Sequence, residues 1–98
     1  MKLEGKKVLV VGAGKSGIAA SELLLDKKIE TVLYDGNKDL DVEKLYEKAP
    51  KLKGMPVLLG ELTDEQLRAF DVAVLSPGVP TDLPVVERMR AQNVCIWG

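Results

Sequence analysis

Three glycines, Gly12, Gly14 and Gly17, have the spacing of a phosphate-binding turn. In such a turn the first glycine permits a tight bend, the second lets a phosphate approach the backbone, and the third lets a helix pack closely on a strand. The backbone N–H groups around Gly14, Lys15 and Ser16 would lie at the positive end of that helix, which favours anions. This spacing therefore predicts the binding of nucleotide phosphates.

Gly14, Lys15 and Ser16 also match the end of a different motif, the P-loop of ATP-binding proteins. A P-loop needs another glycine five positions before this triplet, where it turns the chain around the phosphates. That position is Leu9, which lies inside an apolar run. The spacing therefore disfavours a P-loop and leaves the dinucleotide-type fingerprint.

The elements around the glycines fit that fingerprint. Residues 8–11 are continuously apolar and β-branched, which is typical of a strand buried on both faces of a parallel sheet. A second predicted strand, residues 31–34, ends at Asp35, 23 positions after Gly12, where an acidic residue is expected to bond a ribose or a base edge. The helix between them is predicted to bury one apolar face, formed by Ile18, Ala19, Leu23, Leu24 and Leu25.

The rest of the chain continues to alternate between helices and strands. Thr63 and Gln66 have the spacing of a capping box, which predicts the start of a short helix that includes Leu67 and Phe70. The other predicted elements are helices over 42–49 and from 81 or 82 to 92, and strands over 55–60, 71–75 and 94–97. This order predicts an α/β fold, a Rossmann-like open parallel sheet of about five strands with flanking helices.

Ligands of such sheets bind beyond the carboxyl ends of the strands. Three loops, residues 12–17, 35–38 and 76–80, are predicted to converge there. In the third loop, Ser76 offers a hydroxyl and Gly78 lets the backbone approach a ligand. The residues of this third loop fit a simple strand-to-helix turn equally well. The glycine loop also fits a turn that serves only helix packing, with Asp35 as an ordinary carboxylate at the end of a strand.

Composition excludes several classes of function. The 98 residues carry 14 basic and 15 acidic side chains, so no net field attracts nucleic acid or an anionic membrane. The absence of histidine removes the commonest general base and most zinc sites, and no catalytic or metal-ligating residue is predicted. The single cysteine, Cys95, excludes an internal disulfide, and we expect it to be a small core residue.

Four stretches together resemble one family. They are Gly5-Lys6-Lys7-Val8, the glycine loop from Gly12 to Gly17, Asp35 after the second strand, and Ser76-Pro77-Gly78-Val79-Pro80. The chain resembles the N-terminal domain of the Mur ligases, in the branch that adds D-glutamate, over essentially all 98 residues. The glycine loop occurs in many nucleotide-binding folds, whereas the Ser-Pro-Gly stretch is far more specific. The resemblance favours a UDP-sugar over NAD or ATP as the ligand.

The resemblance implies that residues 1–98 are a single N-terminal UDP-substrate-binding domain of a longer cytoplasmic, monomeric ligase. That enzyme would join D-glutamate to UDP-N-acetylmuramoyl-L-alanine with ATP and magnesium, through domains beyond residue 98, so the 98-residue chain alone is expected to be inactive. The diphosphate would lie on Gly14, Lys15, Ser16 and Gly17. Uracil would meet Asp35, Gly36 and Asn37, and the stretch Ser76, Pro77 and Gly78 would close the site.

Two positions depart from the expected family pattern. Gly36 replaces a residue with a side-chain contact, and Lys15 replaces an apolar residue. The alternative interpretation is a NAD-binding Rossmann module from a dehydrogenase or a transport regulator, in which Asp35 would bond a ribose hydroxyl. A third interpretation is a protein-interaction domain with a flavodoxin-like fold.

Overall fold

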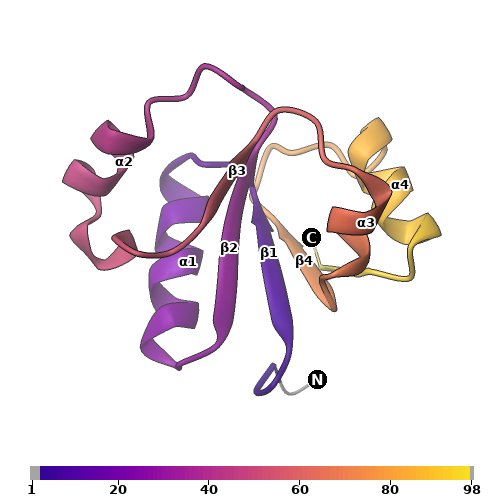
Figure 1. Ribbon diagram of the computed structural model, residues 1–98, viewed down its shortest axis with the longest axis horizontal. Helices are drawn as coiled ribbons and strands as arrows, with labels where there is room; N and C mark the ends of the chain where they lie inside the picture. Colours follow the sequence, from indigo (N-terminus) through magenta and orange to yellow (C-terminus); the bar gives the residue numbers. More distant parts are fainter. Residues whose placement is uncertain (1–2, 98) are drawn as a thin grey trace.

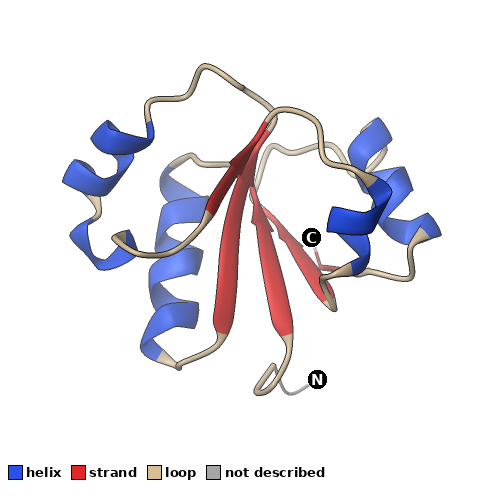
Figure 2. Cartoon of the chain, in the orientation of Figure 1, coloured by secondary structure: helices blue, strands red, loops and turns tan. Residues whose placement is uncertain are grey.

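The centre of the molecule is a sheet of five parallel strands in the order β3-β2-β1-β4-β5 (Figures 1 and 2). The structure is a computed structural model, and it describes residues 3–97. The strands are β1 (Lys7–Val11), β2 (Glu30–Asp35), β3 (Val57–Leu59), β4 (Val72–Leu75) and β5 (Cys95–Trp97). The predicted Rossmann-like sheet of five parallel strands is therefore confirmed.

Helices cover both faces of the sheet. They are α1 (Lys15–Asp26), α2 (Val42–Lys48), α3 (Asp64–Arg68) and α4 (Pro84–Ala91), and a 3-10 turn, η1 (Pro50–Leu52), follows α2. Figure 1 shows α1 and α2 on one side of the sheet and α3 and α4 on the other. This arrangement leaves the carboxyl ends of the strands free to carry loops.

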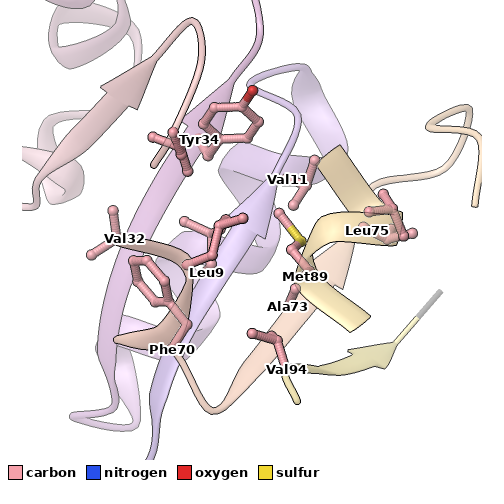
Figure 3. Close-up of a cluster of buried hydrophobic side chains, with 12 residues drawn as sticks. Leu9, Val11, Val32, Tyr34, Phe70, Ala73, Leu75, Met89 and Val94 are labelled. Atoms are coloured by element: carbon pink, nitrogen blue, oxygen red, sulfur yellow. The ribbon is translucent and has the colours of Figure 1, made fainter. Parts of the chain in front are cut away.

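Two apolar clusters form the core, one on each face. Successive side chains of a strand point to opposite faces, so Val8 and Val10 of β1 pack toward α1 and α2, whereas Leu9 and Val11 pack toward α3 and α4. Figure 3 shows the second cluster, in which Met89 of α4 lies near β1 and β4. Because both faces are buried, the strands have continuous rather than alternating apolar sequences.

The predicted capping box is present at the start of α3. The Thr63 hydroxyl accepts a hydrogen bond from the backbone N–H of Gln66 at 3.1 Å, and the Gln66 side chain accepts one from the Thr63 N–H at 2.8 Å. This reciprocal pairing satisfies two N–H groups that a helix of only five residues would otherwise leave unpaired.

The buried face of α1 agrees with the prediction only in part, since Leu24 is buried and Ile18 and Leu25 are half-buried against the core. Gly17, Ser21 and Leu24 are the buried residues, while Ala19 is exposed and the Leu23 side chain is 57% exposed. Small residues face the sheet because α1 lies close to it, and the Ser21 hydroxyl is satisfied by donating to the Gly17 carbonyl at 2.8 Å.

Three smaller expectations need correction near the end of the chain. Phe70 lies after α3, although it packs in the core as predicted. The last helix begins at Pro84, a residue well suited to a first helical turn, rather than at 81 or 82. Cys95 is half-buried rather than fully buried.

Candidate functional site

The strand order brings the three predicted loops to one point on the sheet edge. β1 lies between β2 and β4, because the chain builds β2 and β3 on one side of β1 and then crosses over to build β4 on the other. The loops after β1, β2 and β4 are therefore neighbours at a switch point of strand order, where ligands bind in open α/β sheets. Hydrogen bonds between Ala13 and Asp35 and between Ser76 and Gly12 hold these loops together.

Gly12 and Gly17 are needed for the shape of the first loop. Gly12 has a φ of +102°, a conformation that residues with side chains rarely adopt. A Cβ on Gly17 would lie 1.8 Å from the Gly12 carbonyl oxygen and 2.9 Å from the Ser76 hydroxyl oxygen. Gly17 thus lets the first turn of α1 sit directly against the loop, as the fingerprint predicts.

Gly14 is different, because nothing in the protein requires it to be glycine. Its φ is −77°, and a Cβ built there would meet no heavy atom within 4 Å. Gly14 is the N-cap of α1. No side chain caps this end of the helix, and its first turn contains no acidic residue. The first N–H groups of α1 have no partner within the helix, and Gly14, Lys15 and Ser16 at this helix end are exposed.

Asp35 joins the first loop to the second. One carboxylate oxygen accepts a hydrogen bond from the backbone N–H of Ala13 at 2.9 Å, and the other accepts one from the N–H of Asn37 at 2.8 Å. Each oxygen retains a further lone pair for a ligand. The carboxylate therefore fixes the relative position of the two loops and remains able to accept another hydrogen bond.

The second loop is held by its own polar groups. The Asn37 side-chain oxygen accepts a hydrogen bond from the Asp39 N–H at 3.0 Å, and the Asn37 carbonyl accepts one from the Leu40 N–H at 3.2 Å. Gly36 is exposed, and a Cβ there would make only an ordinary contact, 3.7 Å from the Tyr34 hydroxyl oxygen. The loop is thus a defined turn whose residues 36–39 are all exposed.

Ser76 joins the third loop to the first. Its hydroxyl donates to the Gly12 carbonyl at 3.2 Å and its backbone N–H donates to the Val11 carbonyl at 3.0 Å. The hydroxyl proton is therefore used within the protein, and only the oxygen can still accept from a ligand. Pro77 and Gly78 are exposed, with Gly78 at a φ of +90°.

A fourth loop, after β3, reaches the same edge and was missed by the sequence analysis. The Tyr34 hydroxyl donates to the Gly60 carbonyl at 2.5 Å, and the Gly60 N–H donates to the Asp35 carbonyl at 3.0 Å. Gly60 has a φ of +78° and directly follows a strand, which is the signal that could have identified it. Tyr34 and Gly60 thus support the loop that carries Asp35.

The electrostatics of Tyr34 suit a hydrogen-bond donor. Burial raises the pKa of its phenol above the ordinary value of 10.0, and the Asp35 carboxylate raises it further, while Arg88 partly opposes this change. The phenol therefore keeps its proton at neutral pH and can donate to the Gly60 carbonyl.

This arrangement can bind an anion next to a polar heterocycle. It offers exposed N–H groups at the start of α1, the exposed cation Lys15, and a carboxylate held close by. Within residues 3–97, no cluster of His, Cys, Asp or Glu is suited to hold a metal ion, and no helix is long and apolar enough to span a membrane.

Comparisons with known sequences agree with the family resemblance. The profile of the family described as "Mur ligase MurD-like, N-terminal domain" matches residues 6–98. The UDP-N-acetylmuramoylalanine–D-glutamate ligase of Lachnoclostridium phytofermentans is 47% identical over 98 residues, and that of Koribacter versatilis is 37% identical over 100 residues. Both matches cover all of this chain, which spans only 22% and 21% of the length of these relatives.

Solved structures agree on the fold. A pseudomurein peptide ligase type C from Methanothermus fervidus aligns with a TM-score of 0.71 at 18% identity, covering 93% of this chain and 18% of the ligase. A minor L-lactate dehydrogenase from Enterococcus mundtii aligns with a TM-score of 0.55 at 21% identity, covering 91% of this chain and 35% of that protein. At these identities the likeness concerns the architecture alone.

Proposed function

The chain belongs to the MurD-like N-terminal domain family of the Mur ligases, and from this premise we propose that it binds the UDP part of UDP-N-acetylmuramoyl-L-alanine. The observation that carries the proposal is the uncapped start of α1 at Gly14, with open space where a side chain would stand. It lies beside a carboxylate that is fixed between two loops. A nucleoside diphosphate needs both features, one for its phosphates and one for its base.

The diphosphate would lie over Gly14, Lys15, Ser16 and Gly17. The N–H groups of the first turn point out of the helix end, where the helix dipole favours negative charge. The absence of a Cβ at Gly14 lets a phosphate oxygen approach these groups, and the exposed Lys15, the first residue of α1, would add a positive charge near the phosphates. Gly17 contributes indirectly, because it lets the helix start so close to the loop.

Uracil would lie against the loop of Asp35, Gly36 and Asn37. A carboxylate oxygen of Asp35 can accept the uracil N3–H, since each oxygen makes only one hydrogen bond within the protein. Gly36 presents backbone rather than a side chain, so it would contribute its own N–H or carbonyl. Ser76, Pro77 and Gly78 would bound the other side of the ligand, with the exposed Gly78 leaving room for it.

The whole protein would be an ATP-dependent ligase that adds D-glutamate to this substrate in cytoplasmic peptidoglycan synthesis. Matched relatives carry that name and are several times longer than this chain. ATP and magnesium would supply the activation of the substrate carboxyl group in the remainder of the protein. Residues 1–98 would bind and orient the nucleotide end, and we expect no ligase activity from these residues alone.

An amide NMR titration tests this proposal directly. UDP-N-acetylmuramoyl-L-alanine is expected to shift the amide signals of residues 14–17, 35–37 and 78, whereas NADH at the same concentration leaves them unchanged. Shifts with NADH alone would instead favour the dinucleotide-binding interpretation. If the isolated chain binds neither ligand, the same comparison is made by calorimetry on the full-length protein, where failure to bind the UDP-sugar refutes the proposal.

A further inference from the structure

One part of the sheet is less well covered than the rest. On the face that α1 and α2 cover, Val74 of β4 and Cys95 and Trp97 of β5 are only half-buried. On the opposite face, α4 packs on β5, and Met89 of α4 is fully buried. Parallel sheets normally have helices on both faces. Ile96 of β5 is half-buried on the α4 side as well, but Ala73 and Leu75 of β4 are buried there, so β4 is better covered on that side.

An apolar groove of about 590 Å³ lies at this place. It runs between α1 and the outer strands, and its lining includes Leu3, Ala20, Leu23, Leu24, Val74 and Trp97. Leu23 is the exposed large hydrophobic side chain in the part of the chain that the structure describes, and it lies on the rim. Glu4 and Lys27 add one charge of each sign to the lining, so the groove has no net charge that selects an ionic ligand.

Trp97 places the end of β5 at this groove. Trp97 is the last residue of β5 and also lines the groove, so a segment that continues the chain would start at its rim. The matched relatives are much longer, with this chain spanning 21–22% of their length. The chain that follows this region in a full-length protein is therefore tethered beside an unfilled apolar surface, where its effective concentration is high.

We propose that the segment directly following residue 98 in the full-length protein packs into this groove as an amphipathic helix. Such a helix would cover the half-buried side chains of β4 and β5 and the exposed Leu23, as α1 covers β1 and β2. A second copy of the chain is a poorer fit, because a stable protein interface buries about 800 Å² on each partner, and this groove accommodates only a few side chains. The proposal rests on family membership and does not depend on UDP binding.

Thiol labelling of the full-length protein tests this packing. A Leu23→Cys variant is compared with Ala19→Cys, which is on the same helix, is exposed and does not line the groove. Each thiol is labelled with a small maleimide, and the modified peptide is quantified by mass spectrometry, so other cysteines do not interfere. We expect labelling at position 23 to be at least tenfold slower than at position 19 in the full-length protein, and the two rates to agree in the 98-residue chain.

Several outcomes would overturn the proposal. Equal rates at the two positions in the full-length protein would show that the groove stays open. Protection that disappears on dilution to nanomolar concentration would identify a second copy as the occupant. Equal protection in the 98-residue chain would show that residues already present cover Leu23. None of these results bears on the UDP titration, so failure of either proposal can be recognised separately.

Discussion

Gly14 and Gly17 provide a matched pair of substitutions that separates ligand binding from folding. They lie three residues apart in the same loop, yet their surroundings are opposite. A Cβ at Gly14 would meet no protein atom within 4 Å, whereas a Cβ at Gly17 would lie 1.8 Å from the Gly12 carbonyl oxygen. A side chain is therefore expected to affect the ligand at the first position and the fold at the second.

The magnitudes follow from these distances. Gly14→Val is expected to change the free energy of unfolding by no more than about 1 kcal/mol, because φ is −77° and no clash arises. Its side chain would stand between the phosphates and the helix N–H groups, and one lost charge-assisted hydrogen bond of about 1.5–3 kcal/mol raises Kd roughly 10- to 150-fold. Gly17→Ala forces backbone to move and is expected to cost about 3 kcal/mol or more.

Two measurements on the full-length protein distinguish an effect on ligand binding from an effect on folding. Calorimetric titration with UDP-N-acetylmuramoyl-L-alanine gives Kd, and thermal unfolding reports stability. The Gly14→Val protein is expected to melt near the wild-type temperature and to bind weakly, whereas the Gly17→Ala protein melts well below it. Wild-type affinity in a folded Gly14→Val protein would refute the placement of the diphosphate at the start of α1.

Three further outcomes are expected. Asp35→Ala removes the acceptor that joins two loops and should raise the KM for the UDP substrate in the full-length enzyme. Asp35→Asn keeps one acceptor oxygen and should raise the KM less. An unchanged KM in both variants would exclude a role of Asp35 in binding. Thr63→Ala should lower the free energy of unfolding by about 0.5–2 kcal/mol in urea denaturation, whereas Glu65→Ala, an exposed change in the same turn, should have little effect. Because the folded state raises the pKa of Tyr34, the contribution of this phenol to stability should be constant below pH 10 and should be lost as the pH rises through its raised pKa. Tyr34→Phe should therefore reduce the fall in the free energy of unfolding measured above pH 10.

The sequence predicted the strands and the loop convergence because both depend on local signals. Continuous apolar runs marked β1, β2 and β4, and the glycine spacing marked the loop after β1. The buried face of α1 was predicted only in part: Leu24 is buried as expected, whereas Ala19 and Leu23 are exposed and Ser21 is buried. The glycine spacing predicted the close contact at Gly17, whereas no local pattern marked Ser21 as buried.

The contacts within the candidate site were beyond sequence analysis for a similar reason. Asp35 was expected to act on a ligand, and nothing in its spacing indicated that its carboxylate also binds the Ala13 and Asn37 N–H groups. The loop at Gly60 was overlooked because β3 is short and half-buried, so its end carries a weaker signal than the ends of β1 and β2.

The hydrogen bonds of Asp35 change how its substitution must be interpreted. A carboxylate that only contacts uracil would, when removed, weaken the binding of UDP and leave the binding of inorganic pyrophosphate unchanged. A carboxylate that holds Ala13 in place also supports the glycine loop, so its removal should weaken both ligands. Measuring both affinities for Asp35→Ala in the full-length protein separates the two roles. Loss of the negative charge alone would strengthen pyrophosphate binding, so weaker binding of this ligand, which has no base, reports loss of loop positioning. The 2.9 Å bond to the Ala13 N–H leads us to expect weaker binding of both.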